Sequence, residues 1–352
     1  MKHFLSVCMI IRDERNLEEL ITYYILHGVD HFYIYDNESK IPIKTRLYQY
    51  IFRQKCTIIN FPGRPMQVRS YDHCLKNFGK NTEWLYFIDG DEYVFPKKNS
   101  TLREYLMTYN NNPNVHAIGI NWVYYGTSFH EKKQDGFIID KYRYTSNEQD
   151  RHIKTVCKPQ FTKHCRHAHY VQLYDISKYV DPLGNIISGY ANTNPGTIDI
   201  IQVTHYFTRS MEESYEKEKR GRTDNTDPYI VPHLHELHND FKDDSIANKY
   251  LKEVSDLYEK INMDWIVYKA LNPDLEKHFK KPDEYYNHYY THGIKENRFS
   301  KITDKYPDFS VTFYRQNYKD LEHMTDKELE RHYLIHGVNE KRICNSNISK
   351  NI

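Results

Sequence analysis

Asp89 and Asp91 form a D-x-D pair directly after the apolar segment 84–88. Gly90 between them gives the backbone the freedom to turn, so both carboxylates can face one cation. Carboxylate oxygens favour Mg²⁺ or Mn²⁺ over zinc. An acidic surface turn has the same short sequence. The pair alone therefore fits either a divalent-cation site or ordinary turn chemistry.

The segment before this pair is the fourth of a series that we predict to be strands. The strands are expected at 4–11, 31–35, 56–61 and 84–88. Helices are expected between them at 17–25, where apolar residues recur at helical spacing, and at 68–78. Alternating strands and helices build a parallel sheet, whose ligands bind outside the carboxyl ends of the strands. The polar segments 12–14, 36–37 and 89–92 should therefore meet at one edge.

Composition and charge exclude several classes of protein. The 352 residues are 39% hydrophobic and 15% aromatic, with a mean hydropathy of −0.83. This is too polar for a membrane bundle and too aromatic for a disordered chain. With 49 Lys and Arg against 48 Asp and Glu, the net charge is +1. No overall field would attract nucleic acid or acidic lipid, so we predict neither as a partner and expect a local cluster for any anionic ligand.

The cysteines and the N-terminus bear on the compartment. The six cysteines lack the spacing of a disulfide scaffold, which favours reduced, buried thiols. The N-terminal apolar stretch is about eight residues long, short for a signal peptide and far short of the roughly 20 residues that span a bilayer. We therefore predict a cytoplasmic protein, bacterial or in the host of a virus, without a signal peptide or transmembrane segment.

An internal repeat occupies the C-terminal part. Residues 287–298 and 331–342 share the pattern H-Y-x-x-H-G-x-x-E-x-R, and the related halves 268–275 and 314–321 precede them. We predict two helix-rich repeats of about 45 residues, each burying a face against its neighbour. The Tyr and His of each copy should share one helix face that ends at the Gly. That face is either core or a surface for a glycan, a partner or self-association.

Four sequence blocks resemble glycosyltransferase family 92 and its bacterial and viral family 2-like relatives. They are S-V-C-M-I-I-R-D-E at 6–14 followed by 27–39, W-L-Y-F-I-D-G-D-E-Y at 84–93, Y-Y-G-T-S-F-H at 124–130, and V-T-H-Y-F-T-R-S-M-E-E at 203–213 followed by 217–222. Together they cover roughly residues 4–225. Four blocks in the same order are far more specific than D-x-D alone.

The resemblance implies an α/β fold of GT-A type, with a mostly parallel sheet flanked by helices. It implies transfer of a sugar from a nucleoside diphosphate sugar, a UDP-sugar first of all, to a glycan or protein acceptor, with inversion. It also implies Mn²⁺ or Mg²⁺ held by Asp89 and Asp91, with His205 completing the shell after the strand-like segment 200–204. Such a cation stabilises the charge on the departing β-phosphate.

The same blocks indicate the residues that bind the nucleotide sugar. The expected contacts are Arg12, Glu14, Asp36, Asn37, Asp89, Lys217, Arg220 and Arg222. Guanidinium groups suit phosphate oxygens, and a carboxylate after the second strand can bind a base or ribose. An ordinary turn is the alternative for Arg12, Glu14, Asp36 and Asn37. A solvated helix end is the alternative for Lys217, Arg220 and Arg222.

An inverting transfer also needs a general base at the acceptor hydroxyl. The sequence does not identify it. His130 and Asp135 follow the strand-like segment 122–125, in the stretch where acceptor contacts are expected, and are the candidates. Each also fits an ordinary loop residue.

We predict a catalytic domain at 1–240, a linker helix at 241–264 and the two repeats at 265–352. Two other functions stay open. One is a metal-dependent phosphoesterase, which needs a second cluster of carboxylates or histidines. The other is a non-catalytic glycan-binding or scaffolding protein that acts through the repeats. A zinc site at Cys157, His164, Cys165, His167 and His169 is not favoured, because the segment lacks paired C-x2-C spacing.

Overall fold

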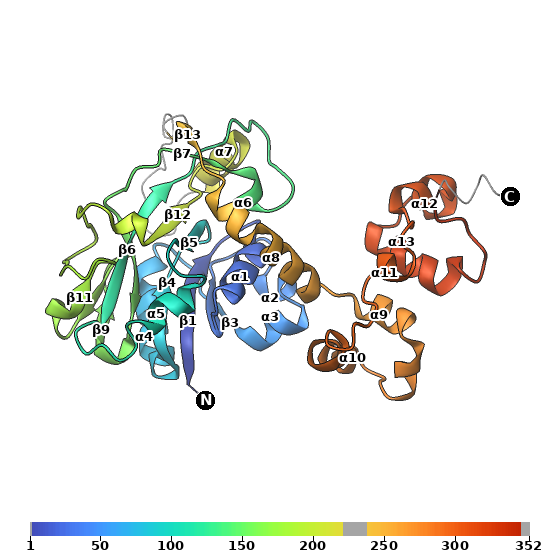
Figure 1. The fold of residues 1–352 in the computed structure, drawn as a ribbon, viewed down its shortest axis with the longest axis horizontal. Helices are drawn as coiled ribbons and strands as arrows, with labels where there is room; N and C mark the ends of the chain where they lie inside the picture. Colours follow the sequence, from blue (N-terminus) through green and yellow to red (C-terminus); the bar gives the residue numbers. More distant parts are fainter. Residues whose placement is uncertain (1, 221–237, 346–352) are drawn as a thin grey trace. The chain divides into compact units, whose positions relative to one another are not determined.

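The computed structural model describes residues 2–220 and 238–345. The chain divides into two compact units, Met1–Tyr258 and Glu259–Ile352 (Figure 1). The division falls within α8 (Ser245–Ile261), the helix that occupies most of the expected linker. Each unit has its own buried core, and the first carries the sheet.

The first unit is built on a nine-stranded sheet in the order β3-β2-β1-β4-β8-β6-β12-β5, with β11 paired to β6. The strands are β1 His3–Ile11, β2 His31–Asp36, β3 Cys56–Asn60, β4 Thr82–Phe87, β5 Glu92–Pro96, β6 Ala117–Tyr124, β8 Ile153–Cys157, β11 Tyr179–Val180 and β12 Ile201–His205. Neighbours are parallel except that β8 runs against β4 and β6, and β5 runs against β12. This mostly parallel sheet confirms the predicted α/β class.

Helices cover both faces of the sheet. They are α1 Leu17–Leu26, α2 Ile43–Arg46, α3 Tyr50–Lys55, α4 Gln67–Phe78, α5 Leu102–Met107, α6 Ile138–Lys141, α7 Met211–Arg220 and α8. On one face α4 packs Tyr71 and Cys74 against Cys8 of β1 and Phe87 of β4. Side chains alternate along a strand, so Tyr86 points to the other face, where it meets Tyr24 of α1. Two small sheets complete the unit, β9 (Thr162–Cys165) with β10 (Val171–Leu173) and β7 (Tyr144–Thr145) with β13 (Phe241–Lys242).

The strand directions bring several chain segments to one edge. β8 opposes both β4 and β6, so β4 and β6 run the same way, and with them β1, β2, β3 and β12. The carboxyl ends of these six strands therefore meet at one edge, as predicted for 12–14, 36–37 and 89–92. The two reversed strands, β5 and β8, begin at that same edge. The site is built where these ends and beginnings converge.

The second unit is helical. Its helices are α9 Trp265–Leu271, α10 Pro282–His288, α11 Ile302–Lys305, α12 Val311–Asn317 and α13 Asp326–His332, with 3₁₀ helices at Pro273–Lys277 and Lys319–Leu321 and π-helical turns at Tyr289–Gly293 and Tyr333–Gly337. One cluster of buried residues surrounds Tyr268, and an equivalent cluster surrounds Tyr314. Arg331 of the second repeat pairs at 2.7 Å with Asp264, the residue that caps the N-terminus of α9.

The two copies of the repeat pattern share one arrangement of Tyr, His and Gly. The Tyr268 hydroxyl lies 3.0 Å from His288 Nδ1, and a Cβ added to Gly293 would lie 2.2 Å from that hydroxyl. Gly337 faces Tyr314 in the same way. As expected, each helical segment ends at its Gly, because the π-helical turns finish at Gly293 and Gly337. The Gly leaves room for a buried tyrosine.

Two further expectations concern cysteines and membranes. All six cysteines are free thiols; Cys56 is partly exposed and the others are buried. Among the residues that the structure describes, no helix has the length and apolar character needed to cross a bilayer.

Candidate active site

Asp89, the first residue of the D-x-D pair, follows β4 and accepts three hydrogen bonds or ion pairs. The donors are Gln67 and Tyr71 of α4 and Lys154 of β8, with 3.0 Å to the Tyr71 hydroxyl and 2.7 Å to the Lys154 ammonium. The Asp89 backbone N–H donates to the Glu92 carboxylate at 2.9 Å. The carboxylate of Asp89 is thus held from both the helix and the neighbouring strand.

Lys154 is a buried cation beneath the acidic motif. Its side chain and that of Glu92 are both 0% exposed, and the ammonium lies 3.5 Å from the Glu92 carboxylate. Burial alone would lower the pKa of Lys154, but the charges of Asp89 and Glu92 raise it above its usual value. Burial raises the pKa of Glu92 well above its usual value. The charged lysine therefore compensates the carboxylates that β4 and β5 bring together.

Asp91, the second residue of the pair, meets His205 at the end of β12 and Lys217 of α7. His205 Nε2 lies 3.4 Å from the Asp91 carboxylate, and the Lys217 ammonium forms a close ion pair with it. Burial would raise the pKa of Asp91, but Lys217 and His205 hold it well below its usual range. Burial lowers the pKa of His205 despite Asp91. Asp91 is therefore an ionised carboxylate beside an imidazole nitrogen.

Two cavities adjoin at Asp91. The first, of about 780 Å³, is lined by basic residues of α7 and of the loop after β1, and we call it the basic cavity. The second, of about 410 Å³, is lined by Asp89, Asp91 and His205 together with the rings of Trp122 and Tyr124, and we call it the aromatic cavity. Arg12, Glu14, Lys217 and Arg220 line both. A ligand that spans them would pass Asp91.

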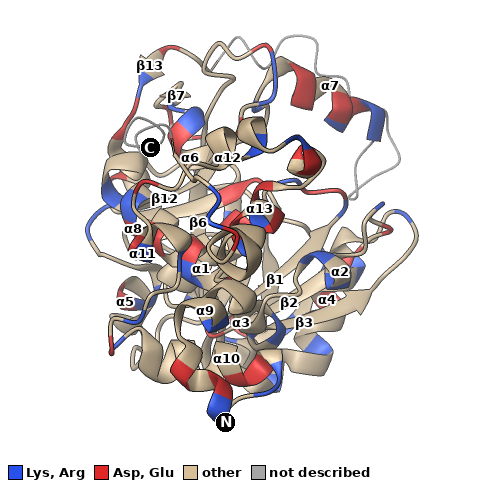
Figure 2. Ribbon diagram, turned by 90° about the vertical axis from the view of Figure 1, so that its right-hand side faces the viewer, with Lys and Arg blue, Asp and Glu red and all other residues tan. Residues whose placement is uncertain are grey.

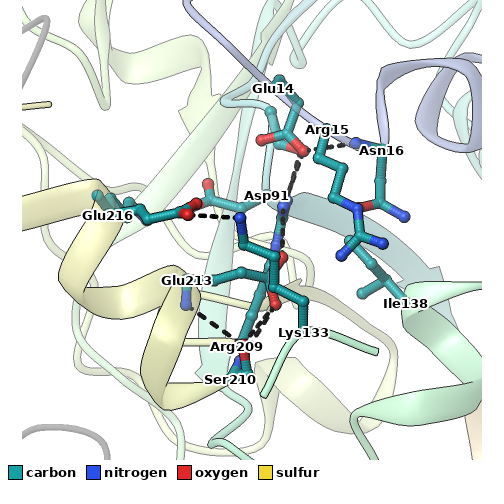
Figure 3. A network of polar contacts seen from close by, with 12 residues as sticks. Glu14, Arg15, Asn16, Asp91, Lys133, Ile138, Arg209, Ser210, Glu213 and Glu216 are labelled. Atoms are coloured by element: carbon teal, nitrogen blue, oxygen red, sulfur yellow. Dashed lines mark hydrogen bonds and ion pairs between the residues drawn. The ribbon is translucent and has the colours of Figure 1, made fainter. Parts of the chain in front are cut away.

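The basic cavity has a surplus of positive charge. Nine of its described lining residues are Lys or Arg and five are Asp or Glu. Helix α7 contributes charges of both signs (Figure 2). Arg209, just before α7, pairs with Glu14 at 2.8 Å and approaches Glu213 at 3.8 Å, a network drawn in Figure 3. The surplus suits a ligand with several negative charges.

Arg12 and Arg220 connect the loop after β1 to the end of α7. The Arg220 guanidinium donates to the backbone carbonyls of Arg12 at 2.6 Å and Asp13 at 3.3 Å. Arg12 Nε and Nη1 are buried without a hydrogen-bond partner in the described part of the chain. Unsatisfied buried donors are costly, so these two nitrogens are suited to donate to an oxygen of a ligand.

Several predicted contacts lie outside both cavities. Asp36 accepts backbone N–H groups of the loop that follows it, Ser39 at 3.1 Å and Ile43 at 2.9 Å. Asn37 donates to the carbonyls of Phe61 and Gly63. These side chains fix the loops after β2 and β3. Arg222, also predicted to bind phosphate, lies outside the described residues.

The two candidates for the general base lie in the loop after β6. His130 Nε2 lies 3.0 Å from the Lys141 carbonyl, and Asp135 is a fully exposed loop residue paired with Arg15. Neither lines the basic or the aromatic cavity. In the segment considered for zinc, Cys157 and Cys165 pack in the hydrophobic core instead.

Sequence reasoning missed Lys154, Gln67 and Trp122, which the fold brings to the D-x-D pair. Lys154 belongs to the segment 154–159, which resembles a K-x-x-x-x-P pattern of the family, and this was its only signal. Trp122 falls in a strand-like segment and carries no other signal in the sequence. Packing between elements that are distant in the sequence brings these residues to the D-x-D pair. The spacing of the residues in the sequence does not reveal that packing.

The residues at Asp91 fit a divalent cation in part. Asp91 and His205 approach each other closely and offer the oxygen and nitrogen ligands that Mn²⁺ accepts, and Asp89 lines the same cavity. Within the described chain, no three His, Cys, Asp or Glu side chains are grouped as ligands. Lys217 now supplies the positive charge beside Asp91. A cation there would need further ligands from its substrate.

The comparison with known sequences identifies a family. Residues 3–242 match the family model of glycosyltransferase family 92. A glycosyltransferase family 92 protein of Oryza sativa subsp. japonica is 28% identical over 159 residues, which are 45% of this chain. The match spans 27% of the rice protein, about a quarter of its length.

Solved structures show only a distant likeness. HddC from Yersinia pseudotuberculosis is 10% identical, with a TM-score of 0.30, over 50% of this chain and 90% of that one. Glucosyl-3-phosphoglycerate synthase from Mycobacterium tuberculosis, solved with Mn²⁺, uridine diphosphate and phosphoglyceric acid, is 12% identical, with a TM-score of 0.27, over 46% of this chain and 57% of that one.

Proposed function

The chain belongs to glycosyltransferase family 92, and we propose that it transfers a sugar from a nucleoside diphosphate sugar to a hydroxyl of a glycan or protein acceptor. The observation that carries the proposal is the meeting of the basic and the aromatic cavity at Asp91. One cavity suits a diphosphate and the other suits a sugar. The bond that changes would lie between them.

The basic cavity is the proposed site of the nucleoside diphosphate. Arg12 offers buried donors without an acceptor among residues 2–220 and 238–345, and Lys217 and Arg220 line the same wall. These groups would stabilise the charge that develops on the β-phosphate as the sugar leaves. A UDP-sugar is the first donor to test.

The aromatic cavity is the proposed site of the transferred sugar and the acceptor. The rings of Trp122 and Tyr124 provide apolar faces, while Asp89 supplies a hydrogen-bond acceptor held by Tyr71 and Lys154. Sugars combine apolar faces with hydroxyl groups, and sites for such ligands pair aromatic walls with a few placed polar groups.

We propose that Asp91 and His205, with Asp89 nearby, hold Mn²⁺ or Mg²⁺ when the nucleotide sugar binds. Bound there, the cation would add positive charge at the departing diphosphate. Lys217 would then release Asp91 and could pair with a phosphate oxygen, since its side chain lines both cavities. The transfer itself is proposed to be a single displacement with inversion.

Ligand-dependent melting and transfer assays with Asp91→Asn test the proposal. The wild-type protein should melt at a higher temperature with a nucleoside diphosphate and Mn²⁺, because a ligand that binds only the folded state stabilises it. Asp91→Asn keeps the volume of the side chain but removes its charge. It should lose the Mn²⁺-dependent shift and slow transfer by about 10²–10³-fold or more.

Asp256→Asn, on the exposed surface of α8, is the matched control and should keep both properties. Uridine, guanosine and adenosine diphosphates are compared, each with and without Mn²⁺. Melting that no nucleotide changes, or transfer by Asp91→Asn within about threefold of wild type, would refute the proposal.

A further inference from the structure

A histidine that the sequence did not single out lies at the same edge of the sheet. His152 directly precedes β8, and its backbone is fixed on both sides. The backbone N–H of Trp122 donates to the His152 carbonyl at 3.0 Å, and His152 forms an antiparallel β-bridge with Ala191. Its side chain lines the aromatic cavity together with Asp89 and Asp91. The His152 ring is therefore held at the wall of the aromatic cavity.

Asp150 orients the His152 ring. One Asp150 carboxylate oxygen accepts both the His152 backbone N–H at 2.8 Å and ring Nδ1 at 2.7 Å. The hydrogen bonds from His152 lower the pKa of Asp150 although burial would raise it. Nδ1 must carry the proton to donate to this ionised carboxylate, so the neutral ring presents Nε2 as a proton acceptor.

Asp150 is itself well anchored. Its backbone N–H donates to the Trp122 carbonyl at 2.9 Å, and its carbonyl accepts from the Asn121 side chain at 2.9 Å. Both members of the pair thus extend the pairing of β8 with β6. A histidine oriented by a buried or half-buried carboxylate is stabilised when it takes up a proton, which is the requirement for a general base.

The other two histidines of the aromatic cavity lack this arrangement. His169 Nδ1 lies 3.1 Å from the Ile153 carbonyl, and burial together with the charge of Lys154 lowers the pKa of His169 far below its usual value. His205 uses Nε2 toward Asp91. Among the described histidines that line this cavity, only His152 has both features of a base. Its Nδ1 contacts a carboxylate, and its Nε2 forms no hydrogen bond with the described residues.

We propose that His152 is the general base of the transfer and that Asp150 is its positioning residue. The inference rests on the proposed function. Nε2 takes the proton of the acceptor hydroxyl while that oxygen forms a bond to the anomeric carbon of the donor sugar. The bond from that carbon to the β-phosphate oxygen breaks, and the nucleoside diphosphate leaves with the electron pair. His152 then passes the proton to solvent.

Steady-state transfer kinetics and nucleotide binding are measured for His152→Gln, Asp150→Asn and the control His167→Gln, with the UDP-sugar and acceptor that the wild type uses. His167 contacts the ring of His169 but lines neither cavity. His152→Gln should lower kcat by about 10²–10⁴-fold. Its affinity for uridine diphosphate with Mn²⁺ should stay within about threefold of wild type, since the base does not bind the diphosphate.

Asp150→Asn tests the positioning role. The amide can donate to Nδ1 and so favours the ring form with a proton on Nε2, which cannot accept another. It should lower kcat while the KM for the donor stays unchanged, and His167→Gln should retain wild-type kinetics.

Transfer by His152→Gln at a rate within about threefold of wild type would overturn the inference. The inference would also be overturned if the affinity of His152→Gln for uridine diphosphate fell by the same factor as its kcat. These outcomes are separate from failure of the proposed function, in which the wild type itself transfers no sugar and binds no nucleotide. An unchanged kcat in Asp150→Asn would remove the positioning role.

Discussion

Lys154→Met should destabilise the first unit strongly. The wild-type ammonium is fully buried between Asp89, at 2.7 Å, and Glu92, at 3.5 Å. Methionine fills a similar volume but leaves the two carboxylates without their cation. Breaking a buried ion pair by removing one partner costs on the order of 3–5 kcal/mol, because the remaining charge is uncompensated. In a unit of this size that corresponds to a fall in Tm of about 6–20 °C.

The loss of unfolding free energy in Lys154→Met should grow as pH rises. Burial raises the pKa of Glu92 in the folded state, and Lys154 opposes that rise. Without Lys154 the folded-state pKa lies further above the unfolded value. A group with a raised folded-state pKa contributes stability at low pH and loses it as pH rises through that pKa. The free energy of unfolding of Lys154→Met should therefore fall further below that of wild type as pH rises past the folded-state pKa of Glu92 in the wild type, which itself lies well above the usual value of 4.5.

Chemical denaturation followed by circular dichroism at several pH values, together with Tm, measures this effect. Lys252→Met is the control, since Lys252 is largely exposed in its pair with Asp256, and it should leave the unfolding midpoint unchanged. A Lys154→Met protein as stable as wild type, or one whose deficit grows on acidification, would refute the view of Lys154 as the cation that compensates Asp89 and Glu92.

Two further changes test other parts of the molecule. His205→Ala should weaken the binding of uridine diphosphate in the presence of Mn²⁺ but not in its absence, as measured by titration calorimetry. If the variant and the wild type bound uridine diphosphate with equal affinity under both conditions, His205 would be a structural residue. Gly293→Ala should cost about 1–3 kcal/mol, because the new Cβ would lie 2.2 Å from the Tyr268 hydroxyl. Adding Tyr268→Phe should restore part of that loss in thermal melts, and a double variant no more stable than Gly293→Ala would contradict the steric account.

Local patterns predicted much of the fold. The four expected strands correspond to β1, β2, β3 and β4, and the helices expected at 17–25 and 68–78 correspond to α1 and α4 within two residues at each end. These elements pack through their own apolar residues, so their sequence carries the signal. The D-x-D pair was placed correctly at the edge of the sheet for the same reason.

Loop residues were harder to interpret. Asp36 and Asn37 stand at the carboxyl end of β2 as expected. The side chains of both residues form hydrogen bonds with backbone groups of neighbouring loops. A polar residue at a strand end serves a ligand or its own loop equally well, and only the direction of the side chain separates the two. The sequence pattern contains no information about that direction.

The reversed strands explain why Lys154 and His152 were not anticipated. Reasoning from a parallel sheet looks for functional side chains after the carboxyl ends of strands. Because β8 is antiparallel to both β4 and β6, its first residues arrive at that same edge, and Lys154 reaches Asp89 from there. β5 likewise begins at the edge, with Glu92 as its first residue. In such a sheet, each reversed strand adds to the site the residues at its amino end, and a search of the sequence for a general base should include them.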